Sequence, residues 1–267
     1  MPPLSFDRHR AEIVRQTELL RETVKEPDSA DLTAPVPTRP DWTLGRLLRH
    51  LGGAHRRAEE VVRTRAAGTP PEGRDDDESA PADEDAAALD GRLAEGAERL
   101  AETLAAAGPE AEVWTPVPGV ASAAFWARRM AFETAVTRAD AALVTGAAYT
   151  LDEDVALGML DEWMEYGTSP EAYREAPGRP ALLGPGRTLH FHATGTSPGA
   201  AGEWLVDLTG DRPVWRHAHQ KAAVAARGPL TDLVMLLYGR PAGGVEIFGD
   251  RTLLDLWLDR SASWLNE

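Results

Sequence analysis

The sequence contains no cysteine, and this absence removes several kinds of chemistry at once. Disulfide bonds, thiolate metal sites and a cysteine nucleophile are all excluded, so any thiol that the protein uses must come from outside. Lysine is scarce as well, because Lys25 and Lys221 are the only two lysines among 28 basic residues. Together with abundant alanine, glycine and proline, this bias is typical of a GC-rich genome, for example an actinobacterial one.

Long hydrophobic runs and basic clusters are also missing. No run approaches the length of a membrane span, and the N-terminal residues lack the apolar core of a signal peptide. We therefore expect a soluble, cytoplasmic protein without a membrane partner. The formal net charge of −15 argues against a nucleic-acid partner, because phosphate binding needs a basic surface. The sequence also contains no phosphate-binding glycine-rich loop and no dinucleotide fingerprint.

The first half of the chain is predicted to be helical. Apolar periodicity and capping residues place helices at residues 6–25, 43–66, 85–107 and 125–146, with Asp41 or Thr43 as the cap of the second. We expect an antiparallel four-helix bundle over residues 1–149, with no strand before residue 110. The acidic segment 68–84 has few apolar side chains and is predicted to be a mobile loop.

The second half, residues 150–267, has a different pattern. One helix (152–166) is followed by a link rich in proline and glycine and then by short alternating segments. We expect strands at 188–194, 203–207, 213–216, 222–226 and 244–248, and helices at 230–238 and 250–264. The prediction is a small α+β domain with an antiparallel sheet, so that the whole chain is of the α+β class.

Three polar residues interrupt the apolar face of the helix at 125–146. Glu133, Thr137 and Asp140 fall within a stripe that is otherwise apolar. A carboxylate facing a core is costly unless a cation, a metal or a hydrogen-bond donor neutralises its charge. Two interpretations are open: a partly exposed Glu133 paired with an arginine, or the wall of a polar pocket in which Glu133 or Asp140 acts as an acid or base.

Two histidines lie on the helix at 43–66. Periodicity places His55 near the centre of the apolar stripe and His50 on its flank. Either histidine is explained equally well as a core-edge side chain bonded to a carbonyl or as a metal ligand directed across the bundle at Glu133. Spacing alone favours His55 as the ligand.

Other histidines occur in the second half. His190 and His192 alternate on one strand and therefore share a face, which is most simply explained as the solvated face of a sheet. We assign no role to His217 or His219. Arg240 follows an apolar helix and its Gly239 stop, where a cation is favoured by the helix C-terminus.

Several segments together resemble the mycothiol-dependent maleylpyruvate isomerase family. The segments are Pro40-Asp-Trp42-Thr-Leu-Gly-Arg-Leu-Leu-Arg-His50, Arg129-Met-Ala-Phe-Glu133-Thr-Ala-Val-Thr137-Arg-Ala-Asp140, Gly202-Glu-Trp204-Leu-Val, Arg227-Gly-Pro-Leu-Thr-Asp232-Leu, Leu237-Tyr-Gly-Arg240 and Phe248-Gly-Asp250. The resemblance implies a DinB-like metal-binding bundle followed by a domain resembling sterol carrier proteins. It also implies mycothiol as the thiol, and a divalent metal, usually zinc, bound by His50 and Glu133. An arginine of the second domain is linked to activity in the family, and Arg240 matches it.

The family's third metal ligand is absent from this chain. The family pattern has Glu-x-x-x-His on the fourth helix, whereas Thr137 stands at the histidine position. A threonine hydroxyl is a poor zinc ligand at neutral pH. The site is therefore expected to have lost its metal, to use His55 or Asp140 as a substitute ligand, or to be a weak site completed by substrate, in that order of preference.

These observations lead to one functional hypothesis and two alternatives. The leading hypothesis is a thiol-dependent isomerase or transferase that acts on a small carboxylated molecule at the domain junction, with Arg240 orienting a carboxylate. The first alternative is a metal-free binding or regulatory protein. The second is a specialised biosynthetic enzyme in which Glu133 or Asp140 is the acid or base.

Overall fold

A computed structural model describes residues 4–25, 31–68, 86–173 and 180–262. Contacts between Cα atoms divide the chain into a helical unit, which ends at Tyr149, and a C-terminal unit, which begins at Thr150. The predicted loop at 68–84 lies, beyond Gly68, outside the described residues. None of the described helices combines the length and the apolar character that crossing a bilayer requires.

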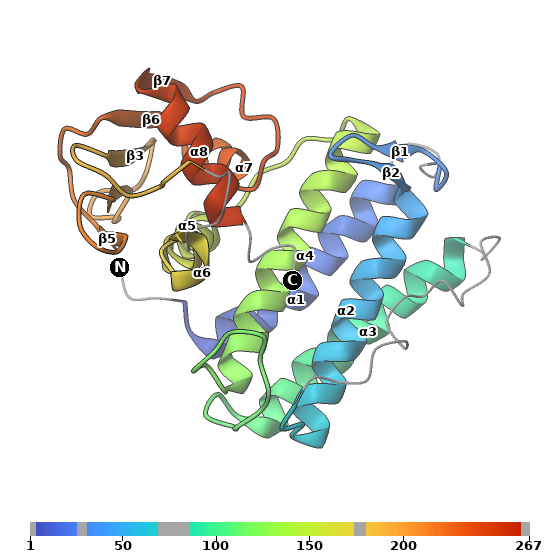
Figure 1. Ribbon diagram of the computed structural model, residues 1–267. Coiled ribbons are helices and arrows are strands. Elements are labelled where there is room, and N and C mark those ends of the chain that lie inside the picture. The colour runs from blue at the N-terminus through green and yellow to red at the C-terminus, as the bar shows by residue number, and fades with distance from the viewer. Residues whose placement is uncertain (1–3, 26–30, 69–85, 174–179, 263–267) are drawn as a thin grey trace. The chain divides into compact units, whose positions relative to one another are not determined.

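Four long helices form the helical unit and pack side by side (Figure 1). They are α1 (Phe6–Lys25), α2 (Leu44–Thr64), α3 (Ala86–Ala107) and α4 (Ala123–Thr145). Leucines of α1, α2 and α3 form much of one shared core cluster, to which α4 contributes Ala141. The prediction that the chain begins with a helical region is therefore confirmed.

The ends of α2 and α4 follow from local chemistry. Thr43 caps α2, since its hydroxyl accepts a hydrogen bond from the backbone N–H of Arg46 at 3.2 Å. Gly146 ends α4 in the left-handed conformation, with φ of 74°, and its N–H donates to the carbonyl of Ala142. Both residues lie where the sequence predicted a boundary.

A short hairpin corrects the expectation that no strand precedes residue 110. Strands β1 (Pro35–Val36) and β2 (Arg39–Thr43) pair antiparallel just before α2. Proline is tolerated in short edge strands because they do not need every N–H for pairing, so the prolines here do not exclude a hairpin. Val36 is fully buried in the core of the helical unit and anchors the hairpin there.

The C-terminal unit combines helices with one five-stranded sheet (Figure 1). Its elements are α5 (Glu153–Gly167), α6 (Pro170–Tyr173), β3 (Thr188–Thr194), β4 (Glu203–Asp207), β5 (Val214–Arg216), β6 (Val224–Pro229), α7 (Leu230–Leu237), β7 (Glu246–Gly249) and α8 (Arg251–Ser261). The strand order is β5-β4-β3-β6-β7. This arrangement confirms the predicted α+β class of the second half.

One pairing in this sheet differs from the prediction. The expected sheet was antiparallel, but β3 and β6 pair in parallel, so the sheet is mixed. The reason is the connection after β5, residues 217–223, which carries the chain from one edge of the sheet past β4 and β3. A parallel pair requires such a crossover, whereas the antiparallel pairs β3–β4 and β4–β5 do not.

The two faces of β3 and β4 have different chemistry. On one face Phe191 packs against Trp257 of α8, with ring centroids 5.3 Å apart. On the same face the indole N–H of Trp204 donates to Asp161 of α5 at 2.7 Å. Because side chains alternate along a strand, the opposite face carries His190, His192 and Glu203.

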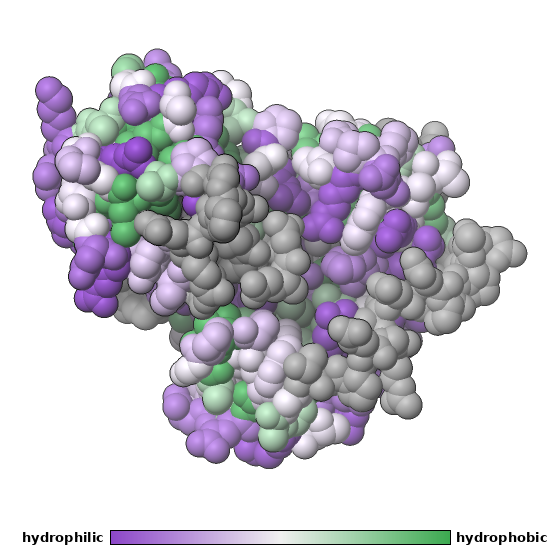
Figure 2. All heavy atoms as spheres, viewed as in Figure 1, coloured by the Kyte–Doolittle hydropathy of each residue, from purple (hydrophilic) through white to green (hydrophobic). Residues whose placement is uncertain are grey.

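The described residues expose few large hydrophobic side chains. On the face seen in Figure 2, hydrophobic residues occur as small, separate areas between hydrophilic ones. Among the described residues, the large hydrophobic side chains that are exposed are those of Val120, Val214 and Phe248. These residues belong to different elements and do not define an extended apolar patch.

Gly249 is expected to be intolerant of substitution. Its φ is 90°, and a Cβ atom added there would lie 2.2 Å from the carbonyl oxygen of Ala223. Gly249→Ala should lower the free energy of unfolding by at least about 2 kcal/mol, through backbone strain and steric overlap. Gly243→Ala is the matched control, because a Cβ atom there meets nothing within 4 Å. Urea denaturation that gives equal midpoints for both variants would contradict this expectation.

Candidate functional site

Glu133 lies between a histidine and an arginine in the helical unit. Its Oε1 is 4.0 Å from Nε2 of His50 on α2, and its Oε2 is 3.6 Å from a guanidinium nitrogen of Arg129, one turn earlier on α4. The side chain of Glu133 is 23% exposed and that of His50 is 41% exposed. The three side chains therefore form a polar group that a small molecule can reach from solvent.

The surroundings of His50 are aromatic and cationic. The His50 ring meets the Trp42 ring edge-on, with centroids 4.9 Å apart. The guanidinium groups of Arg39 and Arg46 lie over the Trp42 ring, at 4.6 and 4.7 Å from its centroid. Arginines stacked on an aromatic face keep their donors available for carboxylates, so the vicinity of His50 favours an anionic ligand.

The other polar residues of α4 are more deeply buried. Thr137 and Asp140 are both buried. Oδ1 of Asp140 accepts a hydrogen bond from the hydroxyl of Thr38 at 2.8 Å, and Thr38 lies in the turn between β1 and β2. This hydrogen bond ties the hairpin to α4, which is a structural contribution of Asp140.

His55 occupies the core of the helical unit. It is fully buried, and its Nε2 lies 2.8 Å from the hydroxyl oxygen of Thr134. That hydroxyl donates its proton to the carbonyl of Met130, so the imidazole Nε2–H is the donor to Thr134. Burial, assisted by the charge of Arg56, lowers the pKa of His55 to about 4 and keeps the ring neutral.

Comparison with protein-family models gives two matches. Residues 13–142 match the mycothiol maleylpyruvate isomerase N-terminal domain, and residues 150–256 match the C-terminal domain of the same family. The chain belongs to the mycothiol maleylpyruvate isomerase family. This confirms the resemblance seen in the sequence, and it makes the protein a member of an isomerase family whose thiol is mycothiol.

Solved structures support the same family fold. A crystal structure of the mycothiol-dependent maleylpyruvate isomerase is similar to this chain with a TM-score of 0.64 and 17% sequence identity, covering 92% of this chain and 95% of that one. A histidine-to-alanine mutant of that enzyme gives a TM-score of 0.65 and 15% identity, with the same coverage. No curated protein matches the chain significantly.

The residues around Glu133 do not fit the zinc ion that the sequence resemblance led us to expect. A catalytic zinc ion usually has three protein ligands, whereas this group offers the His50 imidazole and the Glu133 carboxylate. At residue 137, where the resemblance predicted a histidine as the third ligand, the chain has a threonine. The guanidinium of Arg129 forms an ion pair with Oε2 of Glu133. A positive charge at this carboxylate disfavours a metal cation there.

Arg240 belongs to the C-terminal unit and follows α7. Gly239 turns the chain there with φ of 71°, and the Arg240 N–H donates to the carbonyl of Met235 at 2.7 Å. The half-buried guanidinium also donates to the carbonyl of Tyr238. These hydrogen bonds fix the backbone at the end of α7 and hold the arginine side chain against it.

The C-terminal unit also contains a group that the sequence interpretation missed. His190 and His192 lie on the same face of β3, as expected from their spacing. Glu203 and His219 lie close to them on that face, and the sequence did not suggest this. Glu203 was recognisable in principle, because it faces His192 across a predicted antiparallel pair. His219 carries no such signal, since it lies in the connection after β5, which has no regular structure.

Proposed function

We propose that this protein is a thiol-dependent isomerase or transferase that uses His50 and Glu133 as a metal-free base. The proposed substrate is a small, unsaturated, carboxylated compound of the maleylpyruvate type, and the proposed thiol is mycothiol. The observation that carries the proposal is the position of Glu133 between His50 and Arg129.

Proton transfer from the thiol is the first proposed step. The neutral imidazole of His50 accepts the proton of the bound thiol, and the negative charge of Glu133 stabilises the resulting imidazolium. Arg129 holds the Glu133 carboxylate in place beside His50 through their ion pair. In this scheme His50 is the base, and Arg129 is a positioning residue.

The thiolate then adds to the carbon–carbon double bond of the substrate. The sulfur–carbon bond forms while the π electron pair moves to the adjacent carbonyl as an enolate. Rotation about the resulting single bond, followed by collapse of the enolate, restores the double bond and expels the thiolate, which takes the proton back from His50. If the enolate instead takes that proton on carbon, the adduct is retained and the reaction is a transfer.

The arginines supply the proposed recognition of the substrate. Arg39 and Arg46 lie beside Trp42, next to His50, and are suited to a substrate carboxylate. For Arg240 we propose a related role, the orientation of a carboxylate of the substrate or thiol. This assignment rests on its match to the family's functional arginine.

The substitution Glu133→Gln tests this function. With mycothiol and maleylpyruvate, the protein is expected to show thiol-dependent conversion that survives dialysis against a chelator, and Glu133→Gln should lower kcat/KM by about 100-fold. The matched control is Glu102→Gln, an exposed carboxylate on α3. Absence of thiol-dependent turnover, or an equal loss in the control, would contradict the proposal.

The second candidate function is a metal-free binding protein. The missing ligand at Thr137 and the pairing of Glu133 with Arg129 favour it, because both remove the metal chemistry without removing the polar group. In that case calorimetry would detect binding of the carboxylated compound, while no thiol supports turnover. A biosynthetic enzyme that uses Asp140 as its acid would instead lose turnover in Asp140→Asn and retain it in Glu133→Gln.

A further inference from the structure

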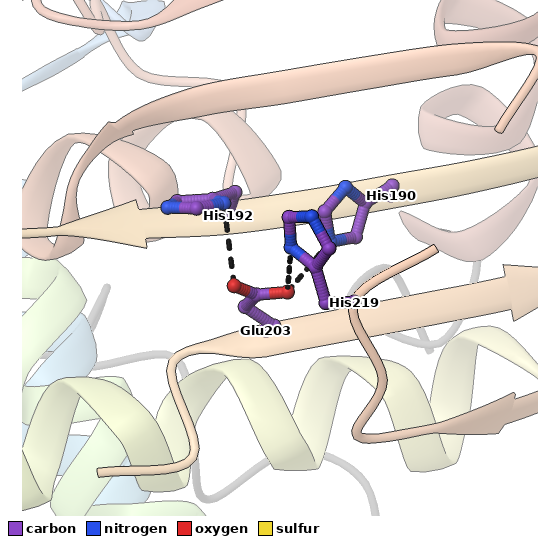
Figure 3. A group of neighbouring side chains, drawn as sticks. All are labelled: His190, His192, Glu203 and His219. Atoms are coloured by element: carbon purple, nitrogen blue, oxygen red, sulfur yellow. Dashed lines mark hydrogen bonds and ion pairs between the residues drawn. The ribbon is translucent and has the colours of Figure 1, made fainter. Parts of the chain in front are cut away.

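We propose that His190, His192, Glu203 and His219 bind a divalent transition-metal ion, preferably zinc, on the sheet of the C-terminal unit. This four-residue group, here called the His3Glu cluster, lies outside the His50–Glu133 site and does not depend on the proposed function (Figure 3). It is built from two strands and the connection that follows a third.

Strand geometry brings the first three members together. His190 and His192 are two residues apart on β3, so both side chains project from the same face. In the antiparallel pair β3–β4, Glu203 lies directly opposite His192 and projects from that face too. The opposite face is filled by the aromatic core, which fixes the register, because a slip by one residue would bury the histidines.

The crossover that makes the sheet mixed supplies the fourth member. Residues 217–223 must carry the chain from the β5 edge past β4 and β3 to reach β6. The segment is anchored at its start, where Nδ1 of His217 lies 3.0 Å from the carbonyl oxygen of Glu203. His219, two residues later, is thereby placed over the face that carries the other three residues (Figure 3).

The distances within the His3Glu cluster are close to those of a metal site. Oε2 of Glu203 is 2.7 Å from Nδ1 of His219 and 3.2 Å from Nε2 of His190, and Oε1 is 3.4 Å from Nδ1 of His192. All four ligand atoms lie within 4.8 Å of one another. Zinc bonds of about 2.0–2.2 Å place tetrahedral ligands roughly 3.4 Å apart, so small side-chain rotations suffice.

The donor set selects the class of metal. Three imidazoles and one carboxylate suit zinc and other late first-row ions, whereas magnesium and calcium prefer oxygen ligands. The His190 side chain is 8% exposed and forms the floor of the His3Glu cluster, while that of His219 is 75% exposed and forms its outer edge. An ion can therefore enter from solvent, and His219 can close over it.

The proposed ion would fasten the crossover to the sheet. In addition to the His217 contact, it would link His219 to β3 and β4 through metal–ligand bonds. Metal bound only to the folded state stabilises that state by mass action. Zinc at about 100 times its Kd should raise Tm by roughly 5–10 °C.

The test is zinc binding by full-length protein without an affinity tag, after removal of metal with a chelator. Competition with a chromophoric chelator is expected to show one zinc ion per chain, and cobalt should give the visible absorption of a tetrahedral site. His219→Ala should weaken zinc binding by at least about tenfold. Because His219 is exposed, this variant is expected to fold, and unchanged circular dichroism would verify that.

His50→Ala is the matched control, because it removes an imidazole from the helical unit and leaves the His3Glu cluster intact. It should leave zinc affinity and the zinc-dependent rise in Tm unchanged. The proposal is overturned if wild-type protein shows no saturable zinc binding, if His219→Ala and His192→Ala both bind as wild type does, or if His50→Ala is the variant that loses the ion. None of these results alters the test of Glu133, which reads thiol-dependent turnover.

Discussion

Acidification from about pH 7 to about pH 4 is expected to destabilise the helical unit by roughly 3 kcal/mol for each of two buried histidines. His9 and His55 are both buried, and burial lowers the pKa of each from 6.5 to about 4. For His9 the charges of Arg128 and Arg8 add to the effect of burial, and for His55 the charge of Arg56 does so. Both rings therefore resist protonation in the folded state.

The sign follows from where the protons bind. Above about pH 6.5 the two histidines are neutral in the folded and unfolded chains, so their contribution to stability is complete. Between about pH 6.5 and pH 4 the two histidines bind protons in the unfolded chain but remain neutral in the folded chain. The free energy of unfolding therefore falls over this range. Below about pH 4 the folded chain is protonated as well, and these two residues cause no further loss.

Urea denaturation at several pH values, followed by far-UV circular dichroism, measures this effect. His55→Gln keeps an amide donor for Thr134 and should remove about half of the loss assigned to the two histidines. Carboxylates also titrate near pH 4, and the difference between wild type and variant separates their contribution. His219→Gln, in the other unit, is the control for replacing a histidine. A wild-type curve parallel to that of His55→Gln would show that His55 does not resist protonation.

Thr137→His is expected to create a zinc site in the helical unit. Thr137 lies one helical turn beyond Glu133, so an imidazole there would share its face and complete a set with His50. Without it, zinc binding by the helical unit should be weak or absent. The zinc affinity of this unit should rise by about 100-fold or more, since even the loss of an outer-shell partner commonly costs a metal site 10–100-fold.

The measurement needs a background in which the C-terminal unit binds zinc weakly. The protein with Thr137→His and the protein without it should therefore both carry His219→Ala. Competition with a chromophoric chelator then measures the zinc affinity of the helical unit. Thr145→His, the same substitution two turns further along α4, is the matched control and should have no effect. Tight zinc binding by the helical unit before the substitution would reveal a substitute ligand, with His55 and Asp140 the first to examine. Failure of Thr137→His to bind zinc would implicate the guanidinium of Arg129.

Features that depend on neighbouring residues were predictable from the sequence. The cap at Thr43 and the stop at Gly146 follow from side-chain and backbone chemistry within one helical turn. The choice of His50 over His55 did not follow from periodicity, which favoured the more buried residue. It came from the family pattern, and the structure places the His50 imidazole, not fully buried, 4.0 Å from Glu133.

Features that depend on residues distant in sequence were not predictable in the same way. Strand β6 pairs in parallel with β3 because it adds to the edge of the sheet opposite β5. The sequence around β6 contains no local pattern that predicts which edge it joins. The His3Glu cluster depends on it, because His219 reaches β3 only through the crossover. The pairing of Arg129 with Glu133 was foreseen only as a general alternative, although the i, i+4 spacing was visible in the sequence.

The position of β6 also determines the order in which the C-terminal unit can assemble. Strands β3, β4 and β5 can pair as soon as they are synthesised, since each is joined to the next by a short connection. The other edge of β3 remains without its partner until residues 224–229 have been made and have crossed the sheet. Closing such a long-range contact costs chain entropy before it gains any pairing energy, so we expect the arrival of β6 to limit the folding rate. Until then the open edge of β3 is the segment of this unit most exposed to pairing with another chain.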